Sequence, residues 1–189
     1  MIITISGVPG SGKTSVAKII AGKLGVPFYS AGAIRGQMAL DRGLTLDELN
    51  ELGEREAFTD HDVDEYQRKL GESGEEFVIE GRLSWHFIPK AFKIFLDCDL
   101  NEAAKRVFSA RTLPGENRDD ERMYADVEDT KAALATRMDS DDRRYRKYYS
   151  LDYRDPANFD LVLDTTTLPS PEATAEKVME ALREKGVTA

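Results

Sequence analysis

The sequence has very little cysteine and histidine. Its 189 residues include one cysteine, Cys98, and two histidines. A disulfide within the chain is therefore impossible, and this cysteine usage is typical of a reducing compartment such as the cytoplasm. Two histidines without a pattern of carboxylates do not indicate a zinc-type metal site. A chain of this length can instead bury a hydrophobic core without metal or disulfide cross-links.

The sequence also lacks long apolar runs and any excess of basic residues. No stretch approaches the ~20 apolar residues that a membrane helix requires, and the apolar run Met1 to Ile5 is too short for a signal peptide. There are 26 Lys and Arg residues against 35 Asp and Glu, a formal net charge of −9. Net negative charge disfavours the approach of a nucleic acid. We therefore expect no membrane and no nucleic acid as partners, and any anion site must be local.

Short apolar runs alternate with segments of helical periodicity. The runs predict buried strands at residues 2–5, 77–79, 92–96 and 159–163, with a short extended stretch at 27–30. The periodic segments predict helices at residues 14–24, 60–70 (ended by Gly71), 100–110, 121–149 and 171–185. Thr45 with Glu48 forms a capping-box pattern that predicts a further helix start. This alternation is typical of an α/β fold with a parallel sheet and helices on both faces, within one domain.

A glycine-rich loop follows the first predicted strand. Gly7 to Thr14 reads G-V-P-G-S-G-K-T and matches the phosphate-binding pattern G-x-x-x-x-G-K-[ST] in full, between a strand and a helix. Glycines let the backbone turn its N–H groups toward an anion, and the helix start adds its positive dipole end. Lys13 supplies a cation for the phosphates. The predicted ATP-binding residues are Gly7, Val8, Pro9, Gly10, Ser11, Gly12, Lys13, Thr14 and Ser15.

The positions of several arginines indicate what ATP reacts with. A kinase whose acceptor is itself phosphorylated must hold two anionic groups in line, and planar guanidinium groups clamp phosphate through two hydrogen bonds. Arg82 follows a predicted strand at its carboxyl end, where open α/β sheets bind ligands. Arg137 and Arg144 lie seven apart, on one helix face, and Asp141 is spaced to hold Arg137. We therefore expect a converging anion site.

Two oxygen-bearing side chains are candidates for a metal ion. The Thr14 hydroxyl lies in the phosphate-binding pattern, and Glu80 lies at the end of the strand predicted at 77–79. Mg²⁺ prefers oxygen ligands and usually keeps several waters. The predicted cofactor is therefore Mg²⁺, held by Thr14 and Glu80 and bound together with ATP.

Nearly the whole chain resembles the cytidylate kinases, in particular their short archaeal-type branch. The phosphate-binding loop is shared by many families, so the distinctive motifs lie elsewhere. These motifs are Ser30-Ala31-Gly32 with Arg35, Glu80-Gly81-Arg82-Leu83, Arg137-(x)₃-Asp141-(x)₂-Arg144-Tyr145, and Phe159 to Thr165. The resemblance implies a P-loop NTPase fold of the nucleoside-monophosphate-kinase type. Its core would cover about residues 1–31, 72–110 and 121–189, with a helical acceptor-binding insert at 32–71 and a short lid at 111–120.

The resemblance also implies residue roles. The acceptor would be bound by Ser30, Gly32, Arg35, Gly81, Arg82 and Asp141. The catalytic residues would be Lys13, Arg82, Arg111, Arg137 and Arg144. The implied reaction moves the γ-phosphate of ATP to CMP or dCMP. Leu83 stands where many cytidylate kinases have Asp, and adenylate kinases resemble the chain less because they carry a different motif at Glu80 to Ser84.

Two alternatives remain open at the level of the sequence. The first is a P-loop kinase for another acceptor, namely AMP, UMP or a phosphorylated metabolite. The second is a regulatory or maturation NTPase, which would hydrolyse its nucleotide without an acceptor. The several arginines favour a kinase, with ATP and a nucleoside monophosphate as its small-molecule partners and a monomer as its expected state.

Overall fold

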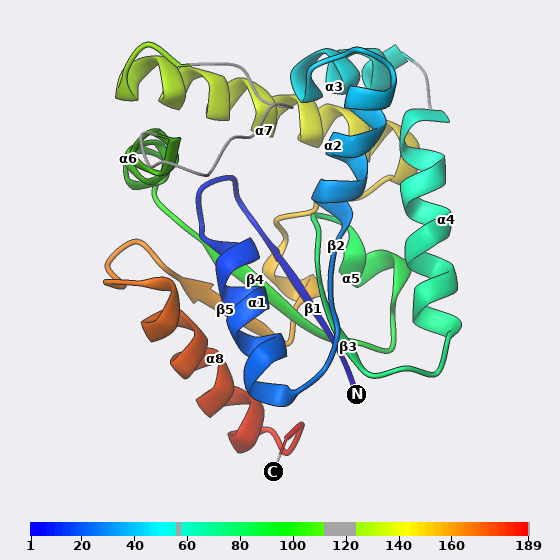
Figure 1. Cartoon of the computed structure of the whole chain (residues 1–189), viewed down its shortest axis with the longest axis vertical. Coiled ribbons are helices and arrows are strands. Elements are labelled where there is room, and N and C mark those ends of the chain that lie inside the picture. Colours follow the sequence, from blue (N-terminus) through cyan, green and yellow to red (C-terminus); the bar gives the residue numbers. More distant parts are fainter. Residues whose placement is uncertain (56–57, 112–123, 189) are drawn as a thin grey trace.

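A parallel five-stranded sheet forms the centre of the computed structural model, which describes residues 1–55, 58–111 and 124–188. The strand order is β2-β3-β1-β4-β5, and every neighbouring pair is parallel. The strands are β1 (Ile2–Gly7), β2 (Phe28–Ser30), β3 (Phe77–Glu80), β4 (Phe92–Asp97) and β5 (Leu161–Asp164). Because all strands run the same way, their carboxyl ends meet at one edge of the sheet, the upper edge in Figure 1.

The first face of the sheet is covered by α1 (Lys13–Leu24) and α8 (Pro171–Glu184). Side chains alternate along a strand, so Ile3 and Ile5 of β1 point to the same face. They form a fully buried cluster with Ile20 of α1 and with Val178 and Leu182 of α8. This packing explains the apolar spacing of both helices.

The opposite face is covered by α5 (Ser84–Phe87) and by the segment that holds Tyr153 and Phe159, and the apolar layer extends from there to α6 (Leu100–Arg111) and α7 (Val127–Tyr149). Aromatic residues fill this layer: the Phe159 ring lies 4.9 Å from that of Phe95 and 5.5 Å from that of Trp85. Tyr153 is fully buried beside them. Trp85 is buried in the same layer.

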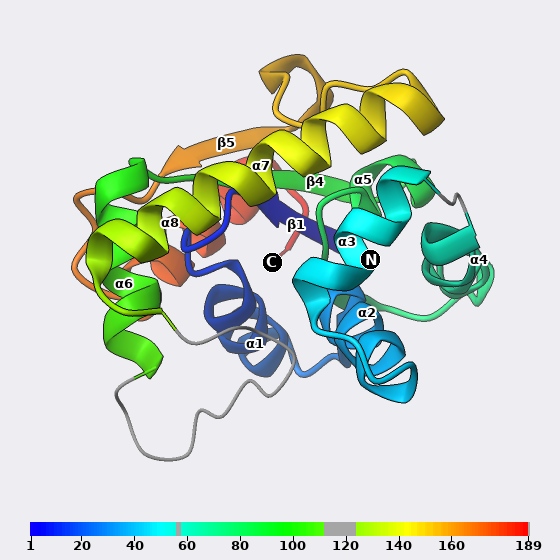
Figure 2. The same ribbon diagram turned by 90° about the horizontal axis from the view of Figure 1, so that it is seen from above.

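A block of three helices lies beside the sheet, above and to the right of β2 in Figure 1. The helices are α2 (Ala31–Asp41), α3 (Leu46–Arg55) and α4 (Phe58–Glu72). The capping box before α3 is formed: Glu48 accepts from the Thr45 N–H at 2.7 Å, and Thr45 Oγ1 accepts from the Glu48 N–H at 3.2 Å. Viewed from above, α7 runs across the carboxyl ends of the strands and reaches α3 (Figure 2). The block and α7 thus enclose the edge where the sheet presents its functional residues.

Several element boundaries differ from the sequence prediction. Gly71 does not end α4, which continues through Glu72; a Cβ on Gly71 would lie 3.1 Å from Ile88, so this glycine permits close packing instead. The long helix begins at Val127, where the Asp126 side chain accepts from the Asp129 N–H at 2.8 Å. The last strand begins at Leu161 because the 3₁₀ turn η1 (Pro156–Asn158) precedes it.

The chain contains no candidate membrane span within the residues that the structure describes: no helix combines sufficient length with sufficient apolar character. Its one cysteine, Cys98, is a buried free thiol at the end of β4. Burial raises the pKa of this thiol above its ordinary value, which keeps it protonated. Cys98 therefore behaves as a packing residue.

Candidate active site

The glycine-rich loop joins β1 to α1 at the upper edge of the sheet. Gly10 and Gly12 have φ values of 77° and 82°, the left-handed region that glycine adopts without strain. A Cβ on Gly10 would lie 2.7 Å from the carbonyl oxygen of Ala103. Gly12 is the N-cap of α1 and has no side chain to satisfy the first helical N–H groups. The loop therefore offers backbone donors and a helix dipole to an anion.

A cavity of about 830 Å³, called the donor cavity here, opens over this loop and is bordered by α6, α7 and the segment before α8. Of the predicted ATP-binding residues, those that line it are Pro9, Gly10, Ser11, Gly12, Lys13, Thr14 and Ser15. Gly7 and Val8 lie outside it. A Cβ on Gly7 would sit 2.3 Å from the Leu96 carbonyl oxygen, and the Val8 side chain packs in the aromatic layer. These two residues shape the loop rather than face the cavity.

A second cavity of about 360 Å³, called the acceptor cavity here, lies between α1, the helical block and α7. The predicted acceptor-binding residues all line it: Ser30, Gly32, Arg35, Gly81, Arg82 and Asp141. Arg144 and Glu80 line it as well. The structure thus gathers residues from β2, α2, β3 and α7 that lie far apart in the sequence.

The donor and acceptor cavities share part of their walls. Lys13, Thr14, Arg82 and Arg137 line both. Three of these four side chains are cations, so positive charge is concentrated where the two cavities meet. An anionic group that passes from one cavity to the other would cross this junction.

Asp141 is the anionic centre of the arginine cluster. Its side chain is 3% exposed; one carboxylate oxygen pairs with Arg82 Nε, and the other lies 2.8 Å from Arg144 Nη2. Burial alone would raise the pKa of Asp141, but the charges of Arg82 and Arg144 outweigh it and hold the pKa below its ordinary value. The charge of Arg137 also lowers this pKa, and the pairing of Asp141 with Arg137 that the i,i+4 spacing suggested stays a prediction. Helix α7 directs Asp141 inward to Arg82, at the end of β3.

Asn50 of α3 is a site residue that the sequence did not reveal. It is buried, and its side-chain oxygen accepts hydrogen bonds from Arg35 Nε and Arg144 Nη1, both at 3.0 Å. A neutral amide oxygen orients two guanidinium groups without cancelling their charge. The one available signal was a polar residue beside Leu49 on the buried side of a predicted helix.

Glu80 and Ser30 lie at the carboxyl ends of neighbouring strands, β3 and β2. The Ser30 hydroxyl donates to Glu80 Oε1 and accepts from the Ala33 N–H at 3.0 Å, which caps α2. Glu80 is buried and lines the acceptor cavity together with Thr14. A carboxylate and a hydroxyl are hard oxygen donors, so this pair fits Mg²⁺ that also binds phosphate oxygens and water. The described residues contain no cluster of three His, Cys, Asp or Glu side chains that would hold a metal alone.

Arg106 of α6 organises the wall of the donor cavity. Its Nη2 donates to the carbonyl oxygens of Thr165 at 2.8 Å and Thr166 at 3.2 Å, and its Nη1 donates to Thr165 Oγ1 at 3.2 Å. That Thr165 hydroxyl also lies 3.3 Å from the carbonyl oxygen of Ser11 in the glycine-rich loop. Arg106 therefore fixes the segment after β5 relative to the phosphate-binding loop.

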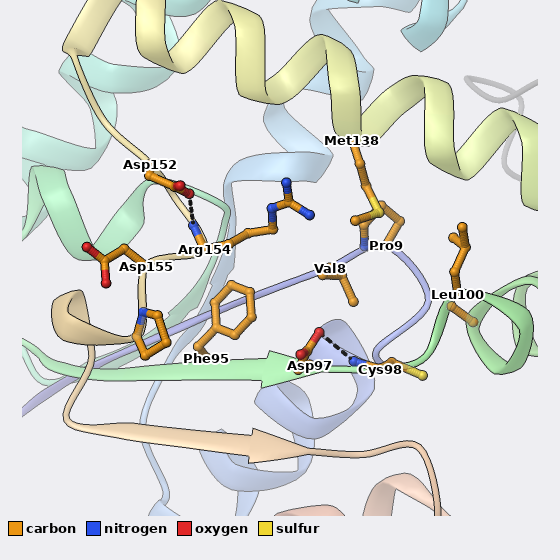
Figure 3. A pocket seen from close by; sticks show the side chains of 12 residues that line it. Val8, Pro9, Phe95, Asp97, Cys98, Leu100, Met138, Asp152, Arg154 and Asp155 are labelled. Carbon is orange, nitrogen blue, oxygen red and sulfur yellow. Dashed lines mark hydrogen bonds between the residues drawn. The ribbon is translucent and has the colours of Figure 1, made fainter.

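A third cavity of about 490 Å³ lies behind the glycine-rich loop, at Val8 and Pro9 (Figure 3). Its acidic residues already serve local structure. Asp152 accepts from the Arg154 N–H at 3.0 Å, and Asp155 accepts from the Ala157 N–H at 3.0 Å. We assign this cavity no role in the reaction.

Two further predictions concern the segment after α6. Arg111 is the last residue of that helix, and its side chain lies outside the described part of the chain. Residues 112–120 of the expected lid lie outside it too. The catalytic role of Arg111 and the lid stay predictions.

Known proteins are similar to this chain in sequence. The sequence model of the cytidylate kinase-like family matches residues 2–167. The cytidylate kinase of Methanocella arvoryzae is 36% identical over 166 residues, which cover 88% of this chain and 88% of that protein. The cytidylate kinase of Natronomonas pharaonis is 38% identical over 184 residues, covering 96% and 89% of the two chains.

Solved structures share the fold at lower sequence identity. A crystal structure of an uncharacterized protein from Eubacterium ventriosum superposes with a TM-score of 0.69 at 18% identity, covering 97% of this chain and 98% of that one. Shikimate kinase from Bacteroides thetaiotaomicron superposes with a TM-score of 0.63 at 16% identity, covering 97% and 98%. At such identities the likeness establishes the fold alone.

Proposed function

Because the chain belongs to the cytidylate kinase-like family, we propose that it is an ATP-dependent kinase that transfers the γ-phosphate of ATP to CMP or dCMP. The observation that carries this proposal is the junction of the two cavities, where Lys13, Arg82 and Arg137 line both walls. Phosphoryl transfer requires a donor and an acceptor held in line with their charge neutralised. Two cavities that meet at three cations supply that arrangement.

In this proposal the donor phosphates rest on the loop from Pro9 to Ser15. The backbone N–H groups and the start of α1 bind phosphate oxygens, and Lys13 reaches the outer phosphates. The acceptor phosphate binds to Arg35, Arg82 and Arg144, which Asn50 and Asp141 orient. None of these groups has to act as a strong base, because positioning and charge neutralisation provide most of the rate.

Mg²⁺ bound with ATP would neutralise phosphate charge at the junction. The residues that would hold it are Thr14, through its hydroxyl, and Glu80, directly or through water. The hydrogen bond from Ser30 orients the Glu80 carboxylate for this role.

A coupled ADP-release assay tests the proposal. It measures turnover with ATP and Mg²⁺ in the presence of CMP, dCMP, UMP, AMP or GMP, and in a blank without acceptor. Strong stimulation by CMP or dCMP over the blank is the expected result. Stimulation by AMP or UMP alone would mean that the protein is a kinase for a different nucleoside monophosphate. Hydrolysis in the blank with no stimulation by any acceptor would instead support a regulatory or maturation NTPase.

A further inference from the structure

The acceptor cavity has two chemically different ends. Its cationic end is the junction with the donor cavity, at Lys13, Arg82 and Arg137. Its other end is bordered by α4, which lies on the far side of α2 from α1 in both views (Figures 1 and 2). A nucleoside monophosphate must place its phosphate at the junction in order to react. Its base must therefore point toward α4.

Among the described residues that line the cavity, α4 contributes one carboxylate. Asp64 lines the cavity on the same side of the helix as Val63 and Gln67, and it is 7% exposed. The other carboxylates that line the cavity are engaged at the phosphate end: Asp141 pairs with Arg82 and Arg144, and Glu80 accepts from Ser30. Asp64 is thus the acidic group placed where the base would lie.

The neighbours of Asp64 hold it in a fixed position. The Tyr149 hydroxyl donates a hydrogen bond to its Oδ2. The Tyr149 ring is itself packed edge-on against Phe87, with ring centroids 5.6 Å apart. The hydrogen bond from Tyr149 therefore orients the Asp64 carboxylate from α7, on the wall of the acceptor cavity.

The amide next to Asp64 contributes differently. Gln67 accepts from the Ser84 hydroxyl at 2.6 Å through its Oε1 and donates to the Val63 carbonyl oxygen at 3.2 Å through its Nε2. Its oxygen is thus directed into the protein. A base at this end would meet the Asp64 carboxylate as its charged hydrogen-bond acceptor.

We propose that Asp64 selects the acceptor base by accepting a hydrogen bond from its exocyclic amino group. Cytosine carries an amino donor at position 4, whereas uracil carries a carbonyl oxygen at the same position. A buried carboxylate attracts the first and repels the second. This inference rests on the proposed function, and it assigns the preference for a 4-aminopyrimidine to one residue of α4.

The test compares kcat/KM for CMP and UMP in the wild type and in Asp64→Asn. An amide can donate to the uracil oxygen, so the ratio of kcat/KM for CMP to that for UMP should fall by about 10- to 100-fold, the range of one well-placed hydrogen bond to a base. The KM for ATP should stay within about twofold, because Asp64 does not line the donor cavity. The matched control is Asp62→Asn on the same helix, whose side chain is 71% exposed; it should leave the ratio unchanged.

A substrate analogue keeps the test independent of the folding of the variant. Pyrimidin-2-one riboside 5′-monophosphate lacks the 4-amino group, so the wild type should use it about 10- to 100-fold less efficiently than CMP. In Asp64→Ala, which removes both acceptor oxygens, the difference between CMP and the analogue should largely disappear, because the two changes remove the same interaction.

Three results would separate the possibilities. A wild type that prefers CMP and also keeps this preference in a folded Asp64→Asn variant would overturn the role of Asp64. Equal loss with CMP and UMP, reproduced by Tyr149→Phe, would show that Asp64 only supports Tyr149, and would overturn the inference too. A wild type without activity on CMP would instead refute the proposed function itself.

Discussion

Asn50 of α3 and Arg144 of α7 are 94 residues apart in the chain and are joined by a hydrogen bond of 3.0 Å. The same Asn50 oxygen also accepts from Arg35 of α2. One neutral amide thus connects the helical block to the long helix over the sheet. It does so at the point where two arginines must be aimed at one acceptor.

Removing this amide should weaken acceptor use. In Asn50→Ala, the buried guanidinium of Arg144 and the half-buried one of Arg35 lose a shared acceptor, so the free energy of unfolding should fall by about 1–3 kcal/mol. We expect kcat/KM for CMP to fall about tenfold or more, with KM for ATP within about twofold. Steady-state kinetics and urea unfolding measure both. The control is Glu51→Ala, an exposed position on the same helix; unchanged kinetics in Asn50→Ala would contradict the role.

The low pKa of Asp141 predicts a pH-dependent stability. Its folded-state pKa lies below the ordinary 3.8, so its contribution to stability is fully present above pH 3.8 and is lost as pH falls through the folded value. Asp141→Asn should therefore be less stable than the wild type at pH 7, by about 3–5 kcal/mol for a broken buried pair. This difference in the free energy of unfolding between the wild type and Asp141→Asn should become smaller below about pH 4.

Urea unfolding between pH 3 and pH 7 measures this gap. Asp139→Asn is the control, since Asp139 is exposed on the same helix. A gap between the wild type and Asp141→Asn that stays constant with pH would argue against a charged Asp141 in the folded protein.

The turn after β3 should require glycine. A Cβ on Gly81 would lie 2.4 Å from Ser84 Oγ and 2.7 Å from the Ala31 side chain. Gly81→Ala should therefore destabilise the protein by about 1–3 kcal/mol through overpacking, and it should displace Arg82. Gly22→Ala is the matched control: nothing lies within 4 Å of its Cβ, and helix propensity should make it neutral or stabilising by up to about 1 kcal/mol. The unfolding temperatures of the two variants, compared with that of the wild type, test this expectation.

Loss of Arg106 should weaken the binding of ATP and leave the binding of CMP unchanged. Arg106→Ala removes the donors that hold the Thr165 and Thr166 carbonyl oxygens, so we expect KM for ATP to rise about tenfold while KM for CMP changes little. Arg106→Lys should raise KM for ATP by a smaller factor than Arg106→Ala, because an ammonium keeps the charge but lacks the planar fork. Equal increases in both KM values would indicate a general loss of structure.

Lys13 should be essential for turnover. It lines both cavities at their junction, and Lys13→Ala removes a cation that neutralises phosphate charge as it moves. We expect kcat to fall below about one tenth of the wild-type value, and by a larger factor if Lys13 acts mainly in the transition state. The surface variant Lys177→Ala should keep full activity. A Lys13→Ala enzyme above that tenth would count against the proposed mechanism.

Local sequence patterns predicted most of the fold. The glycine-rich loop could be recognised because its residues are contiguous and their spacing reflects one backbone conformation. Arg82 could be placed because it follows a strongly apolar strand, and parallel strands end at a common edge. Helix boundaries were harder: Gly71 resembled a helix stop, but it lies within α4 because the helix packs closely on Ile88.

The residue that was missed depends on long-range contacts. Asn50 has an ordinary spacing within its helix, and its role appears only when α7 comes close to it. Asp141 was recognised as an arginine partner, but its pairing with Arg82 depends on how α7 is rotated over the sheet. A periodicity within one helix carries no information about that rotation.

The shared wall between the two cavities has a thermodynamic consequence. Lys13, Thr14, Arg82 and Arg137 border both, so an occupant of one cavity changes the electrostatic potential in the other. Linkage then requires reciprocity: whatever factor ATP imposes on the dissociation constant of the acceptor, the acceptor imposes on that of ATP. A single molecule with two nucleosides joined by a chain of phosphates would span the wall, and its second half would bind at a high effective concentration.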